Sequence, residues 1–229
     1  MAVFSSAERY EKRKNKQFLQ EQIVSERKYN TVLSGVVLYG LIINVIICAL
    51  LGDSLAYVSP LKIVIPYFVF TIIGMLMSSK SKNPIISFIG YNFVVLPVGA
   101  LLSAAISEIG GIGAGVVLQA FVCTTLVTVI MVVLSILYPN FFSKLGRVLG
   151  ISLLILIIVR LLALIFNFTI PFISWISATI FSLYIGYDFY KSQVFEKTID
   201  NAIDCALDLY LDIINLFLDI LSILSKNDS

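Results

Sequence analysis

Long runs of apolar residues, separated by short polar or proline-containing breaks, fill most of this 229-residue chain after residue 30. Each run is long enough to cross a bilayer core of about 30 Å, which takes roughly 20 helical residues. The pattern therefore predicts an all-α membrane protein with seven transmembrane helices, and prolines in the breaks support the boundaries. The predicted spans are residues 31–52, 60–78, 84–107, 113–138, 147–169, 171–195 and 203–224.

The last run differs from the others because it carries a row of acidic and amide side chains. At 100° per residue, spacings of four, four, three and four place these side chains within an arc of roughly 80°. The members of this acidic stripe are Asp204, Asp208, Asp212, Asn215 and Asp219. Asp188, near the end of the preceding run, is positioned to join them. Because charge in hydrocarbon is costly, we expect the stripe to face protein or a water-filled cavity and to line an ion pathway.

An amphipathic helix lying on a membrane, or packed in a soluble bundle, is the alternative interpretation of this stripe. An interfacial helix normally carries Lys or Arg on its polar face, whereas this segment has neither between Lys197 and Lys226. A soluble bundle conflicts with the composition, which is 59% hydrophobic and only 13% charged. The pattern therefore favours a helix that crosses the membrane.

The two ends of the chain are polar, and we divide the sequence accordingly. Residues 1–30 form a charged arm, residues 31–224 the transmembrane domain and residues 225–229 a short tail. A nucleic-acid-binding tail is the alternative for the arm. Its basic residues alternate with glutamates, as on an ordinary solvated face, so we expect no nucleic-acid partner.

The distribution of Lys and Arg predicts how the chain is oriented in the membrane. With the N-terminus in the cytoplasm, thirteen basic residues flank the spans on that side and only Lys62 and Lys226 lie on the other. This asymmetry requires an odd number of spans and places the C-terminus outside. The alternative is a re-entrant last segment that returns the C-terminus to the cytoplasm.

Several kinds of chemistry lack the residues that they need. The chain contains no histidine, and its three cysteines, Cys48, Cys123 and Cys205, lie in apolar runs without a CxxC spacing. Zinc sites, haem ligation, disulfide scaffolds and histidine-based catalysis therefore have no support. We expect no resident cofactor and no enzymatic activity.

Arg160 is a basic residue inside a predicted span. It lies about 20 Å along its helix from Arg147, past the middle of the bilayer. An unpaired guanidinium at such a depth costs at least ~2.5 kcal/mol on insertion scales, so a counter-ion is expected. Asp219 lies at a similar depth on the last helix, and we predict that Arg160 pairs with it as a clamp in the outer half of the protein.

Four stretches of sequence together resemble a known family. SLYIGYD (182–188) and ALDLYLDIINLFLDIL (206–221) closely resemble the last two helices of the Bax inhibitor-1 family, which includes bacterial YetJ-like and YccA-like members. YNTVLSGVVLYGLIINVIICAL (29–50) and NPIISFIGYNFVVLPVG (83–99) are also similar to bacterial members. The resemblance extends over nearly the whole chain after residue 28.

The resemblance implies a fold, a location and a mechanism. It implies seven helices with the last one central and surrounded by the other six, in the bacterial inner membrane, and a pH-sensitive calcium leak. A carboxylate pair on the last two helices senses pH in this family, and the matching residues here are Asp188 and Asp212. Some members also have a basic latch residue at the end of the second helix; only Lys80 or Lys82 could replace it here.

The sequence leaves three functions open. Carboxylate oxygens suit Ca²⁺, and two close aspartates share protons because ionising one disfavours ionising the other, which favours a pH-gated Ca²⁺ leak with Asp188 and Asp212 as metal ligands. A proton-coupled cation exchanger would use the same acids. A third possibility is an interaction protein that modulates a membrane protease or a stress response. An intramembrane aspartyl protease is disfavoured because Asp188 lies in GYD rather than in a GxGD motif. Expected partners are membrane lipid, Ca²⁺ and H⁺.

Overall fold

The computed structural model describes residues 22–51, 54, 60–166, 170 and 172–227. Most of the predicted charged arm, the break at Pro171 and the last two residues of the tail lie outside this range. The described residues are α-helical, apart from turns, short connections and one isolated β-bridge between Ile23 and Thr198.

The chain forms two compact units. We call the described residues between 22 and 118, together with 195–210, the α2–α4 unit. The described residues between 119 and 194, together with 211–227, form the α5–α8 unit. Helix α9 (Ile199–Asn227) contributes its first part to the α2–α4 unit and its second part to the α5–α8 unit.

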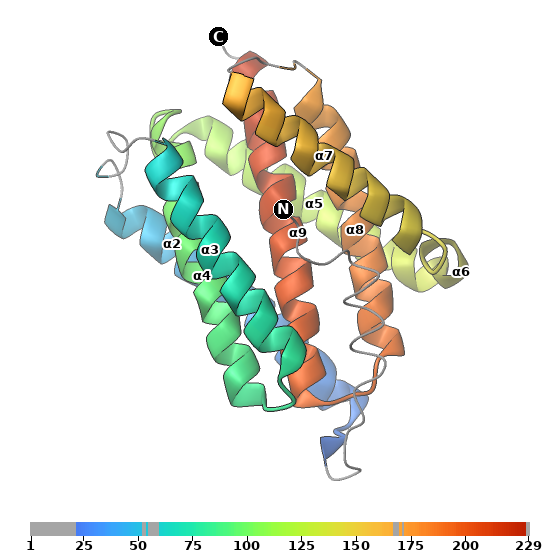
Figure 1. Ribbon diagram of the computed structural model, residues 1–229. Helices are drawn as coiled ribbons and strands as arrows, with labels where there is room; N and C mark the ends of the chain where they lie inside the picture. The colour runs from blue at the N-terminus through green and yellow to red at the C-terminus, as the bar shows by residue number, and fades with distance from the viewer. Residues whose placement is uncertain (1–21, 52–53, 55–59, 167–169, 171, 228–229) are drawn as a thin grey trace. The chain divides into compact units, whose positions relative to one another are not determined.

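The α2–α4 unit is built on three long helices, α2 (Glu26–Leu51), α3 (Pro60–Lys80) and α4 (Pro84–Ser107). α4 lies beside both α3 and α2 (Figure 1). α4 begins where the sequence predicts because the Asn83 side chain accepts a 3.0 Å hydrogen bond from the backbone N–H of Ile85, and Pro84 occupies the first turn. α3 and α4 approach closely where Gly74 faces Gly90: a Cβ on either glycine would meet the other's carbonyl oxygen.

The α5–α8 unit contains α5 (Gly115–Leu137) from residue 119 onwards, the short α6 (Pro139–Phe142), α7 (Gly146–Phe166) and α8 (Ile173–Val194). The one-turn helix α6 was not predicted from the sequence. Pro139 at its first position is pre-organised for a helical turn, which explains why this short segment is helical. α8 contacts both α6 and α7 (Figure 1).

The side chains are distributed as expected for a protein in lipid. Many large apolar residues of α2, α5 and α7 are exposed, including Ile42, Leu126 and Ile155, while polar side chains of α9 are buried. A soluble protein has the opposite distribution, because water rather than lipid covers its surface. This chain is therefore a multi-pass membrane protein.

Five of the helices among the described residues are long and apolar enough to cross a membrane. They are α2, α3, α4, α5 and α7, in the regions of the first five predicted spans. α8 and α9 are long enough, with 22 and 29 residues, but serine and tyrosine dilute the apolar character of α8 and five aspartates that of α9. That these two helices also cross, making seven spans, stays a prediction, as does a central α9.

Candidate ion-pathway site

The aspartates of α9 are the most unusual feature of the structure, because all of them are buried. Every residue from Asp200 to Asp212 is buried, and Asp219 is buried further along the same helix. A spacing of four residues keeps Asp200, Asp204, Asp208 and Asp212 on one side of the helix. The carboxylates thus form a buried polar column along α9.

In the α2–α4 unit, serine hydroxyls donate to the first carboxylates of this column. Ser87 on α4 donates a 2.6 Å hydrogen bond to Asp200, and Ser78 on α3 donates to Asp204. Both serines are themselves buried. Because a buried carboxylate without hydrogen bonds is costly, these hydroxyls help to stabilise the start of α9 between α3 and α4.

A second polar contact connects α9 to α2 in the same unit. The Asn44 side-chain amide donates to the Tyr210 hydroxyl, and the Tyr91 hydroxyl donates to the carbonyl of Val36 at 2.8 Å. The rings of Tyr91 and Tyr210 lie 5.5 Å apart between their centroids. These buried tyrosines combine apolar packing with a satisfied hydroxyl, as buried tyrosines usually do.

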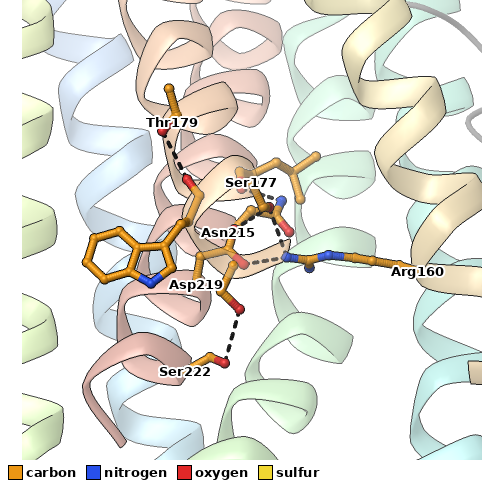
Figure 2. Close-up of polar contacts among 9 residues, drawn as sticks. Arg160, Ser177, Thr179, Asn215, Asp219 and Ser222 are labelled. Atoms are coloured by element: carbon orange, nitrogen blue, oxygen red, sulfur yellow. Dashed lines mark hydrogen bonds and ion pairs between the residues drawn. The ribbon is translucent and has the colours of Figure 1, made fainter. Parts of the chain in front are cut away.

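In the α5–α8 unit, a cation contacts the last carboxylate of the column. Arg160 on α7 forms an ion pair with Asp219, and both side chains contact Ser177 on α8, whose hydroxyl donates to Asp219 (Figure 2). Asp219 is 3% exposed and Arg160 is 40% exposed. Asn215, one turn before Asp219, donates instead to the carbonyl of Leu211 in its own helix.

A second ion pair lies near the end of α8. The Lys191 ammonium is 2.7 Å from a carboxylate oxygen of Asp188, one helical turn earlier. Both side chains are almost completely buried, at 2% and 3% exposed. Two fully buried opposite charges stabilise each other strongly, whereas either alone would be costly.

The structure brings some of the predicted site residues together. Arg160 contacts Asp219, the partner that the sequence predicts for it, although a clamp function stays a prediction. Asp188 and Asp212 are both buried in the α5–α8 unit, and their action as one coupled pair is not tested by these contacts. Lys80 and Lys82, expected as substitutes for a latch, are exposed at and just after the end of α3.

Sequence reasoning missed several polar partners. Lys191 was counted as a basic residue flanking a span, although its position three residues after Asp188 is a signal for an ion pair on one helix face. Asp200 lay before the predicted start of the last span, although it continues the four-residue spacing of the stripe. Ser78, Ser87 and Ser177 gave no comparable signal, because serine is common in membrane helices and its partners depend on tertiary packing.

A resident metal site would need several ligands close together. Within the described part of the chain, no three His, Cys, Asp or Glu side chains are grouped so that they could hold a metal ion. Ca²⁺ usually takes six to eight oxygen ligands, so an ion beside these carboxylates would need water or backbone oxygens as well.

The fold and the site define a class of protein: an all-helical membrane protein with buried carboxylates on its last helix. The family model described as inhibitor of apoptosis-promoting Bax1 matches residues 21–229. The chain therefore belongs to the Bax inhibitor-1 family.

The relatives found among curated proteins are bacterial. An uncharacterized protein of Helicobacter pylori strain J99 is 33% identical over 162 residues, which is 69% of this chain and 70% of that protein. A second Helicobacter pylori protein is 33% identical over 65% of each chain. An uncharacterized Campylobacter jejuni protein is 33% identical over 56% of this chain and 54% of its own length.

Proposed function

We propose that this protein is a pH-sensitive calcium leak channel in which Asp188 and Asp212 gate a cation pathway along α9. The observation that carries the proposal is the burial of all five aspartates of α9 in a protein whose outer faces are apolar. Intramembrane acids are costly, and where they occur they commonly mark ion pathways. The protein then acts without enzymatic chemistry, and Ca²⁺ and H⁺ are its ligands.

The proposed pathway residues are polar side chains of α9 together with Asp188 of α8. Asp204, Asp208, Asn215 and Asp219 line the route, and Asp188 and Asp212 form the gate and bind Ca²⁺ transiently. Arg160 is the counter-ion of Asp219. Protonation of the gate removes negative charge and closes the route, whereas deprotonation restores the cation-attracting carboxylates.

The proposal includes seven spans with α9 surrounded by the other six helices. Family membership and the excess of basic residues on one side support a cytoplasmic N-terminus and an outer C-terminus. Bacterial relatives support the inner membrane as the location.

Single cysteines test this topology after Cys48, Cys123 and Cys205 have been replaced. Cysteines at Ser143 and Lys197 are expected to react with an impermeant thiol reagent only from the cytoplasmic side, and one at Ser229 only from the other side. Cytoplasmic labelling at Ser229 would make the last segment re-entrant.

Calcium flux into proteoliposomes of the purified protein, measured as a function of pH, tests the function. Asp188→Asn and Asp212→Asn are each expected to remove or shift the pH response, and the double variant to add little to either single change. Glu108→Gln is the matched control, because Glu108 is an exposed carboxylate at the end of α4. Additive effects of the two single changes would mean that the aspartates act independently.

The same preparation separates the two alternative functions. A leak carries Ca²⁺ down its gradient without proton exchange, whereas a proton-coupled cation exchanger changes the lumenal pH in proportion to the Ca²⁺ moved. A membrane interaction protein that modulates a protease or a stress response gives no flux that depends on Asp212.

A further inference from the structure

The buried ion pair near the end of α8 bears directly on the proposed gate. Lys191 and Asp188 lie one turn apart, with 2.7 Å between the ammonium nitrogen and the carboxylate oxygen. The ammonium also lies 5.0 Å from the centroid of the Tyr187 ring. A carboxylate and a ring face both attract a cation, so Lys191 is held in place by its charge.

Neighbouring elements pack closely against α8 in the turn before the ion pair. The Phe142 ring of α6 lies so close to Gly186 that a Cβ there would clash with it, and the Tyr187 ring lies equally close to Gly146 at the start of α7. Ser135 of α5 donates a 2.7 Å hydrogen bond to the carbonyl of Gly186. Elements α5, α6 and α7 thus pack against α8 at Gly186 and Tyr187, in the turn before the ion pair, and the Lys191 side chain itself is only 2% exposed.

A lysine ammonium competes directly with a metal cation for a carboxylate oxygen. Both are compact positive charges that bind at short distance, and in a weakly screened interior they repel each other strongly. With Lys191 beside it, Asp188 already has a counter-ion. A Ca²⁺ ion approaching this carboxylate must displace the ammonium or bind beside it against repulsion.

We propose that Lys191 is a tethered counter-ion that occupies Asp188 and limits Ca²⁺ binding at the gate. This inference rests on the proposed function in taking Asp188 as a pathway carboxylate. Lys191 is then a positioning residue that sets how readily the gate accepts a divalent cation. It acts from the same helix as the carboxylate, through its fixed positive charge.

Calcium binding to the full-length protein in detergent tests this role without requiring flux. The readout is thermal unfolding as a function of Ca²⁺ concentration. Lys191→Met removes the charge at similar length and is expected to lower the half-saturating Ca²⁺ concentration by about tenfold or more, since a unit charge a few ångströms away outweighs one decade in affinity. Lys191→Arg keeps the charge and is expected to behave like the wild type.

A double variant assigns the effect to Asp188. Lys191→Met combined with Asp188→Asn is expected to lose the gain in Ca²⁺ affinity and also to fold, because the pair is then neutral. Should Lys191→Met alone not fold, Lys191→Gln makes the same charge change while keeping an N–H donor for Asp188. A purely structural lysine would lower the unfolding temperature equally at every Ca²⁺ concentration.

Different results would contradict the role of Lys191 and the proposed calcium leak. Unchanged Ca²⁺ dependence in the charge-removing variants overturns the role of Lys191, whatever the flux. A gain in Ca²⁺ affinity that requires Asp188, in a protein whose wild-type and variant forms give no flux in proteoliposomes, supports the tethered counter-ion and overturns the leak. Increased flux in Lys191→Met together with increased affinity supports both.

Discussion

The described contacts of the buried carboxylates differ between the two units of this protein. In the α2–α4 unit, serine hydroxyls donate to Asp200 and Asp204. In the α5–α8 unit, Ser177 also donates to Asp219, but cationic side chains contact the carboxylates of Asp188 and Asp219 as well. The comparison is informative because both sets of acids are buried.

A hydroxyl and a cation respond differently when a carboxylate gains a proton. A serine hydroxyl donates to an ionised carboxylate and accepts from a protonated one, so its hydrogen bond survives either way. The attraction between a cation and a carboxylate disappears once the carboxylate is neutral. We therefore expect protonation to change contacts in the α5–α8 unit more than in the α2–α4 unit, which agrees with the gate proposed there.

Breaking the partly exposed Arg160 contact is expected to reduce stability more than removing a serine donor of the α2–α4 unit does. Arg160→Gln leaves Asp219 buried without its counter-ion and should destabilise the protein by about 2–3 kcal/mol, somewhat less than the loss from a fully buried pair because Arg160 is partly exposed. Adding Asp219→Asn should recover part of the loss. The measurement is thermal unfolding in detergent.

Arg147→Gln is the matched control for this change, because Arg147 lies on the same helix and is exposed. It should leave the unfolding temperature close to that of the wild type. If Asp219→Asn made the Arg160→Gln protein less stable still, the two residues would not compensate each other's charge.

Replacing the serine donors of the α2–α4 unit should cost less. Ser78→Ala and Ser87→Ala each remove one hydroxyl hydrogen bond to a buried carboxylate, worth about 1–2 kcal/mol. Ser34→Ala is the control, because that exposed hydroxyl donates only to carbonyls of its own helix. In thermal unfolding in detergent, the loss of stability in both variants should be smaller than in Arg160→Gln and larger than in this control. Losses as large as that of Arg160→Gln would contradict the distinction between the two units.

How far the sequence predicts this molecule depends on the type of signal. The span at 84–107 coincides with α4 because Asn83 and Pro84 mark its start. The last span, predicted as 203–224, lies inside a longer helix, because polar residues at both ends continue the helix beyond its apolar part. α9 in fact begins at Ile199 and ends at Asn227.

In the candidate site, the sequence predicted the partner of Arg160, a basic residue inside a span. A guanidinium inside a span needs a counter-ion, and the rise per residue of a helix places Asp219 at a depth similar to that of Arg160. The two side chains do form an ion pair. The burial of Lys191 was not predicted, because a lysine near the end of a span fits a solvent-exposed flank equally well. Its burial, at 2% exposed, depends on tertiary packing that the sequence does not give.

The smallest expected effect concerns a cation of the α2–α4 unit that contacts an aromatic ring. Lys197, in the connection between α8 and α9, lies 4.6 Å from the centroid of the Tyr29 ring, and its carbonyl accepts a 2.7 Å hydrogen bond from the N–H of Val24. Burial lowers the pKa of Lys197 below its ordinary value of 10.5. Between the folded-state pKa and 10.5, the unfolded chain binds more protons than the folded protein, so the free energy of unfolding rises with pH in that window.

Lys197→Met should lose this rise, because methionine does not titrate. The unfolding temperature in detergent, followed across the alkaline range up to pH 10.5, should therefore increase with pH in the wild type relative to Lys197→Met. Groups that titrate in both proteins cancel in this difference, and the exposed Lys226→Met variant should follow the wild type. Parallel curves for the wild type and Lys197→Met would mean that burial of this lysine has no effect on stability.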